Sequence, residues 1–240
     1  MCPHNPLWSR RRFTAQATAA ASLLLLAHGQ AQALSLADLS DKDASAGLKA
    51  ALEKGAAAAV GLLGQADGFL GNDKVRIPLP GFLNDAAGLL KTLGQGKKVD
   101  ELITAMNRAA EAAVPQAKEL LVNAVKTMNV SDAKSILTGG DNAVTRFFAE
   151  KTREPLGIKF LPIVTQATEK VGLVDKYNDV AGKAAGMGLV KKEDANIQQY
   201  VTGKSLDGLY LMIAEEEKKI RQDPIGAGGA MIGKVFGALK

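Results

Sequence analysis

Apolar residues recur at helical spacing along most of the chain, and this periodicity limits the fold more than any other feature of the sequence. Spacings of three, four and seven residues place apolar side chains on one face of an α-helix. The first such stripe consists of Leu48, Ala51, Leu52, Ala59, Leu62 and Leu63. It follows Ser40 and Asp41, which are typical helix N-cap residues. Runs that alternate apolar and polar residues, the pattern of a half-buried strand, are missing from the sequence.

The same period predicts further helices downstream. They run from about 84 to 93, 99 to 113, 115 to 128, 131 to 139, 141 to 151, 160 to 170 and 194 to 221. Pro115 is expected to kink one helix or to start the next, and Ser131 and Asp141 are expected as N-caps. Pro224 follows the last long helix, where a proline stops or restarts a helix. We therefore predict an all-α fold, an irregular single-domain bundle of roughly eight to ten helices.

The stretch VRIPLP at 75–80 is the one segment that we expect to be extended. Pro78 and Pro80 each bias the preceding residue away from the helical region. We expect a buried crossover loop between helices, with Ile77 and Leu79 packed into the core.

Residues 1–33 have the composition of an export signal. Arg10, Arg11 and Arg12 precede a short apolar core at 19–27, and Ala31-Gln32-Ala33 fits an A-x-A cleavage site. The apolar core is shorter than the roughly 20 residues that span a bilayer. We therefore expect a signal peptide at 1–33 that is cleaved after Ala33, and a single helical domain at 34–240 that resides in the periplasm and has no transmembrane segment.

The sequence from Ser9 to Phe13 also fits the twin-arginine pattern, which addresses a chain to the export route for folded proteins. Thr14 and Ala15 differ from the leucine and lysine that usually follow. We expect twin-arginine export, and an ordinary secretory signal with an extra arginine is the alternative.

The leader contains both histidines, the only cysteine and the only tryptophan of the chain. Residues 34–240 therefore lack the groups needed for Ser-His-Asp or Cys-His catalysis, for most zinc or haem sites and for disulfides. Without the leader, 27 basic and 25 acidic residues remain, a net charge of +2. Basic residues alternate with acidic ones and aromatic residues are few, whereas nucleic-acid binding needs a basic stripe. We expect no cofactor, no metal and no nucleic-acid partner.

One carboxylate near the C-terminus falls on an apolar helical face. That face consists of Leu206, Leu209, Tyr210, Ile213 and Ile220. Glu217 lies about 20° from Leu206 on it, with Arg221 one turn on and Asp207 on the same flank. A core-facing carboxylate is costly unless paired, so we expect Glu217 to be ionised and held by Arg221. The cluster either fixes helix register or forms the polar floor of a ligand cavity with Asp207 at its rim.

A second polar pair lies in the segment 99–113. Asn107 and Glu111 are four residues apart beside the apolar stripe, whereas Arg108 points nearly opposite to it. Surface pairing of Arg108 with Glu111 is one explanation. The other is a polar pocket between helices that Asn107 and Glu111 line.

Several blocks of sequence together resemble a bacterial exported family. They are GLKAAL at 47–52, VRIPLP at 75–80, MNRAAEAAVPQA at 106–117, DAKSILTGGDNAVTRFF at 132–148, FLPIV at 160–164, LDGLYLMIAEEEKKIRQDP at 206–224 and VFG at 235–237. The family that they resemble is catalogued as domain of unknown function 4197. The resemblance implies an exported, helical, single-domain protein, and it supplies no activity, cofactor or catalytic residue.

These observations lead us to expect a periplasmic binding or interaction module for an apolar or amphipathic ligand or for an envelope partner. The alternative is a hydrolase or lyase that uses carboxylates and arginine, with or without a hard divalent ion. Gly229, Gly233 and Gly237 repeat every four residues, so the last helix either docks on the bundle or makes weak contact with a membrane surface. Catalytic residues and the oligomeric state stay unassigned.

Overall fold

The computed structural model describes residues 41–240 except 141, 192–193, 229–231, 233–234 and 236–240. The chain divides into two units, Met1–Ala33 and Leu34–Lys240. The expected signal peptide and the expected N-cap Ser40 lie outside the described residues.

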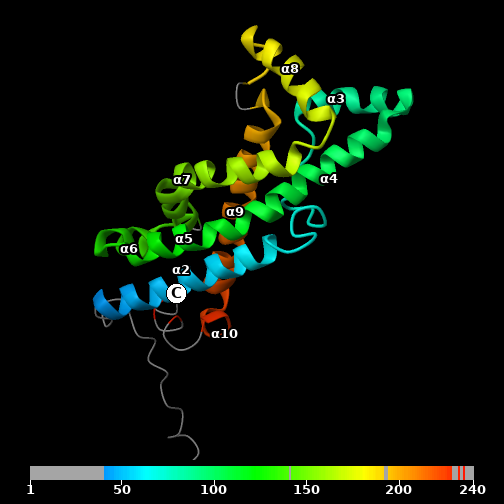
Figure 1. Cartoon of the computed structure of the whole chain (residues 1–240). Helices are drawn as coiled ribbons and strands as arrows, with labels where there is room; N and C mark the ends of the chain where they lie inside the picture. The colour runs from blue at the N-terminus through cyan, green and yellow to red at the C-terminus, as the bar shows by residue number, and fades with distance from the viewer. Residues whose placement is uncertain (1–40, 141, 192–193, 229–231, 233–234, 236–240) are drawn as a thin grey trace, which may run out of the picture. The chain divides into compact units, whose positions relative to one another are not determined.

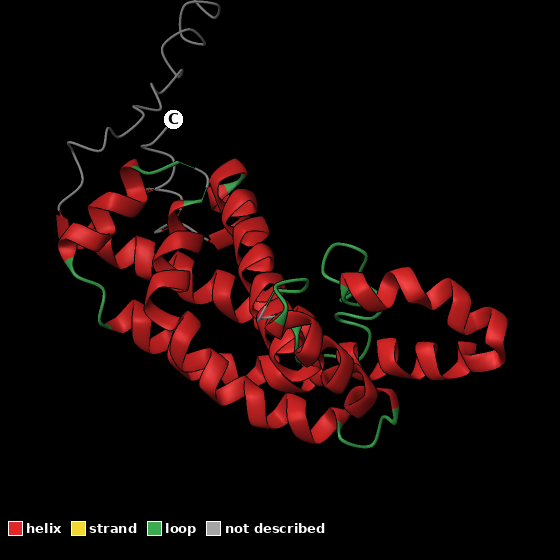
Figure 2. Cartoon of the chain, turned by 90° about the horizontal axis from the view of Figure 1, so that it is seen from above, coloured by secondary structure: helices red, strands yellow, loops and turns green. Residues whose placement is uncertain are grey.

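The described part of the second unit is built from helices (Figure 1). They are α2 (Asp41–Leu63), α3 (Gly81–Leu90), α4 (Gly96–Ala113), α5 (Ala117–Lys126), α6 (Val130–Thr138), α7 (Ala143–Thr168), α8 (Leu173–Gly186), α9 (Ile197–Gln222) and α10 (Pro224–Gly228). A turn with the non-helical residue Gly94, η2 (Lys91–Gln95), joins α3 to α4, and a 3-10 turn, η3 (Val114–Gln116), joins α4 to α5. No strand occurs within the described ranges (Figure 2). The predicted all-α fold is confirmed.

The long helix α9 packs against α7 and α2, and α4 packs against α7. Phe69, Phe148 and Phe160 are fully buried among these helices. Both Ile77 and Leu79 are buried, and the residues from 76 to 80 are non-helical, as the prolines predict. None of the described helices is long and apolar enough to cross a bilayer.

The two helices expected at 141–151 and 160–170 are one helix, α7, with Pro155 and Pro162 inside it. A proline removes an N–H donor and usually ends or kinks a helix. In α7, however, a stripe of buried residues runs past both prolines at a constant spacing of four. It consists of Phe148, Thr152, Leu156, Phe160, Val164 and Thr168. Neither proline lies on this stripe. Burial of the stripe therefore continues past both of them and stabilises α7 as one helix.

The predicted N-cap of α6 was wrong by two residues. Asn129, not Ser131, caps the helix: its Oδ1 accepts a hydrogen bond from the Asp132 backbone N–H at 2.8 Å. The Asp132 carboxylate in turn accepts one from the Asn129 N–H at 3.1 Å. This reciprocal capping box satisfies two N–H groups that would otherwise lack partners. Asp141, expected to cap the next helix, lies outside the described residues.

The structure also contains a helix that the sequence analysis did not predict, α8. Pro224 begins α10, so the helix restarts there. Beyond α10, Ile232 and Val235 are buried, in agreement with docking of the C-terminal segment, whose other residues at 229–231, 233–234 and 236–240 are not described.

Candidate functional site

Glu217 lies in the core on α9 and is paired with Arg221 one turn later. The Glu217 residue is 4% exposed. Arg221 donates to Glu217 Oε1 from Nε at 2.9 Å and from Nη2 at 2.8 Å. Arg221 Nη2 also donates to the carbonyl of Ile136 on α6 at 3.2 Å. The pair therefore joins α9 to α6, and the pairing predicted from helical geometry is present.

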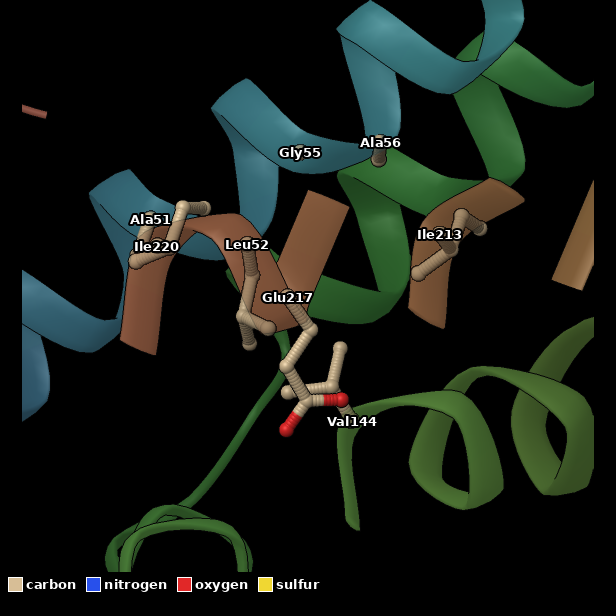
Figure 3. A pocket seen from close by; sticks show the side chains of 8 residues that line it. All are labelled: Ala51, Leu52, Gly55, Ala56, Val144, Ile213, Glu217 and Ile220. Atoms are coloured by element: carbon tan, nitrogen blue, oxygen red, sulfur yellow. The ribbon is translucent and has the colours of Figure 1, made fainter. Parts of the chain in front are cut away.

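Beside Glu217 the helices leave only a small cavity. It is lined by Ala51, Leu52, Gly55, Ala56, Val144, Ile213, Glu217 and Ile220 (Figure 3). The cavity has a volume of about 10 Å³. A cavity of this volume holds about one water molecule. A ligand cavity floored by Glu217 and Arg221 stays a prediction, and this geometry favours the role in helix register.

Asp207 lies away from Glu217. The two residues are ten positions apart on α9, about 15 Å along a helix axis. Asp207 Oδ1 accepts a hydrogen bond from Arg153 Nη2 of α7 at 2.7 Å, and about half of each side chain is exposed. The structure thus places Asp207 on the surface, in a second site described below.

Asn107 binds the backbone of the extended segment. Its side chain is fully buried on α4. Nδ2 donates to the carbonyls of Ile77 at 3.0 Å and Ile103 at 2.8 Å, and Oδ1 accepts from the Ile77 N–H at 2.8 Å. The amide thus pairs with both polar groups of Ile77, as a neighbouring strand would.

Glu111 binds the preceding loop. Oε1 accepts hydrogen bonds from the N–H groups of Phe69 at 3.0 Å and Leu70 at 3.1 Å. Oε2 accepts one from Arg108 Nη1 at 2.6 Å, and Arg108 also reaches Asp67 at 2.8 Å. These bonds to Glu111 and Asp67 raise the pKa of Arg108. Arg108 does pair with Glu111, but Glu111 is buried rather than on the surface. Its oxygens, like those of Asn107, are occupied by protein groups.

A groove that the sequence analysis did not identify lies between the extended segment and α9. It has a volume of about 230 Å³ and is lined by Lys74, Val75, Arg76, Ile77, Pro78, Lys204, Asp207, Gly208 and Leu211. Gly208 is required at its base, because a Cβ there would approach Phe69 Cε1 to 2.8 Å. Asp207 is therefore the one predicted site residue that lines this groove.

Two cations of the groove have no ion-pair partner among the described residues. Asp207 is bound by Arg153, and Lys74 is bound by Glu215 at 2.5 Å. Within the part of the chain that the structure describes, Arg76 and Lys204 have no carboxylate within 4.0 Å.

Apolar and aromatic groups lie beside these cations. Lys204 Nζ lies 5.7 Å from the ring centroid of Tyr200, and Leu211 is 42% exposed. The Tyr200 hydroxyl donates to the Pro78 carbonyl at 3.0 Å. Burial, with a smaller effect of Asp194, raises the pKa of Tyr200 to about 12, so this phenol stays a neutral donor at physiological pH. The groove thus combines positive charge with an apolar wall.

Two sequence patterns could have indicated this groove. Val75, Ile77 and Leu79 alternate with exposed residues, so Arg76 must point away from the core. Lys204 and Leu211 are seven residues apart on α9 and share a helical face.

Among the described residues, no group of three or more histidine, cysteine or acidic side chains could hold a metal ion. In comparisons with known proteins, the family described as "Protein of unknown function (DUF4197)" matches residues 38–237, a range that contains every described helix. Nothing matches the chain among curated proteins or solved structures.

Proposed function

The chain belongs to the family described as a protein of unknown function (DUF4197), and we propose that it is an exported periplasmic binding module for an amphipathic ligand with an anionic head group. The groove between the extended segment and α9 carries this proposal, because Arg76 and Lys204 lie beside Pro78 and Leu211 there. The sequence of residues 1–33 supports the export.

The chemistry of the groove selects the ligand class. A guanidinium and an ammonium group bind carboxylate or phosphate through charge-assisted hydrogen bonds, and arginine can do so with two parallel bonds. Pro78 and the exposed Leu211 offer an apolar surface for the adjoining carbon chain. At about 230 Å³ the groove is smaller than the roughly 300–1,000 Å³ of typical small-molecule pockets. It therefore holds a head group and the first part of a chain, with the remainder on the surface.

The interior of the bundle is a poorer place for an apolar ligand. The cavity beside Glu217 has room for about one water molecule. The same geometry weakens the hydrolase alternative, since Glu217 and Arg221 are hydrogen-bonded to each other and leave no space for a substrate between them.

Nuclear magnetic resonance titrations of the isotopically labelled unit Leu34–Lys240 test the proposal. The ligands are dodecanoate and dodecyl phosphate, each below its critical micelle concentration, and dodecanol below its solubility limit. We expect saturable shifts at 74–78 and 204–211 with the two anions and none with dodecanol. Binding of only one anion identifies the head group as carboxylate or phosphate. Equal binding of dodecanol contradicts the proposal.

A matched pair of double variants locates the site. Arg76→Ala with Lys204→Ala should weaken anion binding at least tenfold, because each charged hydrogen bond contributes about 1.5–3 kcal/mol. Lys118→Ala with Lys176→Ala removes the same charge from exposed positions on α5 and α8 and should leave the affinity unchanged. If both doubles bind alike, the groove is not the site.

A further inference from the structure

The turn between α3 and α4 presents apolar and basic side chains to solvent. We name residues 89–98, LLKTLGQGKK, the hairpin tip. Leu89 and Leu93 are 65% and 64% exposed. Lys91, Lys97 and Lys98 are also exposed, and the hairpin tip contains no acidic residue. Two large, exposed apolar side chains and three positive charges therefore lie within these ten residues.

The hairpin tip lies at the end of a helical hairpin. Figures 1 and 2 both show α3 and α4 running side by side away from the other helices and joining at their far end. The main contacts of α3 are with η2 and α4, and no residue of η2 is buried. Gly94 reverses the chain there with a φ of 76°, a conformation that favours glycine. With about two thirds of each residue exposed, Leu89 and Leu93 make little contact with the described part of the fold.

The charges of the hairpin tip are largely free to act on a partner. Lys91 lies 3.9 Å from Asp100, and more than half of each of these side chains is exposed, so the pairing is weak. Lys97 and Lys98 have no carboxylate within 4.0 Å in the described ranges.

We propose that the hairpin tip docks on the anionic surface of a phospholipid bilayer. Leu89 and Leu93 enter the interfacial layer, and the three lysines contact lipid phosphates. Exposed leucines beside lysines are the composition of segments that lie in a membrane interface. The complementarity of charge selects this partner: each lysine near an anionic membrane surface strengthens binding about fivefold. The contact is peripheral and is separate from the groove at Arg76 and Lys204.

Vesicle sedimentation tests this proposal. The protein is the unit Leu34–Lys240, which is compact in itself, because the apolar core of the leader would bind lipid on its own. The vesicles contain phosphatidylglycerol mixed equally with phosphatidylcholine, or phosphatidylcholine alone. We expect binding to the anionic vesicles that weakens at high salt, and little binding to the neutral ones. Equal binding to both kinds of vesicle, or to neither, overturns the proposal.

Two double variants assign the contact to the hairpin tip. Lys97→Gln with Lys98→Gln should weaken binding about 25-fold, as the loss of two lysines predicts. Leu89→Gln with Leu93→Gln should weaken it at least tenfold, and these exposed changes should leave the thermal unfolding midpoint unchanged. Lys118→Ala with Lys176→Ala, which removes two lysines from exposed positions on α5 and α8, should bind vesicles as the unaltered protein does. Tip variants that bind like the unaltered protein contradict the proposal.

Sedimentation equilibrium without lipid tests whether the hairpin tip instead binds a second copy of the chain. We expect a monomer with or without the two leucines. A dimer that Leu89→Gln with Leu93→Gln dissociates, together with no vesicle binding, would assign the hairpin tip to self-association instead.

Discussion

Asn107 and Glu111 show why single buried polar residues matter in this helical fold. The chain between α2 and α3 is non-helical over 76–80, yet it packs Ile77 and Leu79 into the core. Buried N–H and C=O groups without partners are costly, so other groups must supply the bonds. The Asn107 amide does so for Ile77, and the Glu111 carboxylate does so for Phe69 and Leu70. Two side chains on α4 thus fix the path of the loop that forms one wall of the groove.

Glu217 and Arg221 offer a direct test of a buried pair. Glu217→Ala should lower the free energy of unfolding by about 3–5 kcal/mol, because it leaves the Arg221 guanidinium, with 18% of its side chain exposed, without its carboxylate. Glu217→Leu with Arg221→Met should recover most of this loss, since apolar residues of similar volume replace both charges. Urea unfolding measures both changes. If the double variant is as unstable as the single one, Glu217 and Arg221 stabilise the fold mainly through their contacts with other residues and not through each other.

The buried tyrosines predict a loss of stability at high pH. Burial is the main cause that raises the pKa of Tyr177 and of Tyr200 to about 12, and it also raises the pKa of Tyr210. In the unfolded chain the tyrosine pKa is about 10. The folded state holds these protons more tightly, so stability that is complete below about pH 10 is lost as the pH rises toward about 12. In this range the free energy of unfolding falls by up to about 1.4 kcal/mol per pH unit for each of Tyr177 and Tyr200.

Ultraviolet absorbance of tyrosinate measures this directly, because the unit Leu34–Lys240 has three tyrosines and no tryptophan. We expect tyrosinate to form together with the loss of helical circular dichroism, well above pH 10. In a urea-unfolded control it should form near pH 10. Tyrosinate that forms near pH 10 while the helices are intact would show that the phenols are exposed.

At the scale of elements, the start of α6 allows a comparison of two neighbouring residues. Asn129→Ala removes the cap of Asp132 N–H and should lower the free energy of unfolding by about 0.5–2 kcal/mol. Ser131→Ala changes an exposed residue inside the helix and should alter it by less than about 0.5 kcal/mol. Thermal and urea unfolding of both variants measure the difference. Equal effects of the two changes would contradict the assignment of Asn129 as the cap.

The sequence predicted helices well where apolar periodicity was strong and poorly where proline or glycine interrupted it. The prediction left a gap in α7 at 152–159, which contains Pro155, because a proline weakens the helical pattern locally whereas the buried stripe acts over the whole helix. The helix α8 was missed, since Gly182 and Gly186 weaken its helical signal. Its buried residues nevertheless lie three and four apart. They are Val174, Tyr177, Ala181 and Ala184.

The candidate site could be predicted only in part. The buried position of Glu217 and its hydrogen bond to Arg221 could be predicted because both residues lie on one helix, where the rotation per residue fixes which side chains share a face. The groove instead brings Arg76 next to Lys204 from segments that are far apart in the chain. Asp207 was assigned to the wrong neighbour for the same reason: its partner, Arg153, lies on α7. Contacts between elements depend on packing that no local period encodes.

At the scale of the whole molecule, the topology bears on the proposed export. The helix α2 packs on α9, and α4 packs on α7, so the core joins segments from both halves of the chain. Such a core forms only after most of the chain is available. Since the sequence after residue 2 contains no cysteine, folding requires no disulfide and no oxidising compartment. The chain can therefore fold before the proposed export, which is the order that the twin-arginine route requires.

Export of leader variants from their own cells tests the route. Arg10→Lys with Arg11→Lys should block export, because the twin-arginine receptor recognises the arginine pair and not its charge. Arg12→Lys is the matched control: it changes the variable position of the Ser9–Phe13 pattern and should leave export unchanged. Cell fractionation measures both, and we expect the exported protein to begin at Leu34. Normal export of the double variant that depends on the general secretory channel would show an ordinary secretory signal, because that channel accepts lysine as well as arginine in the charged region.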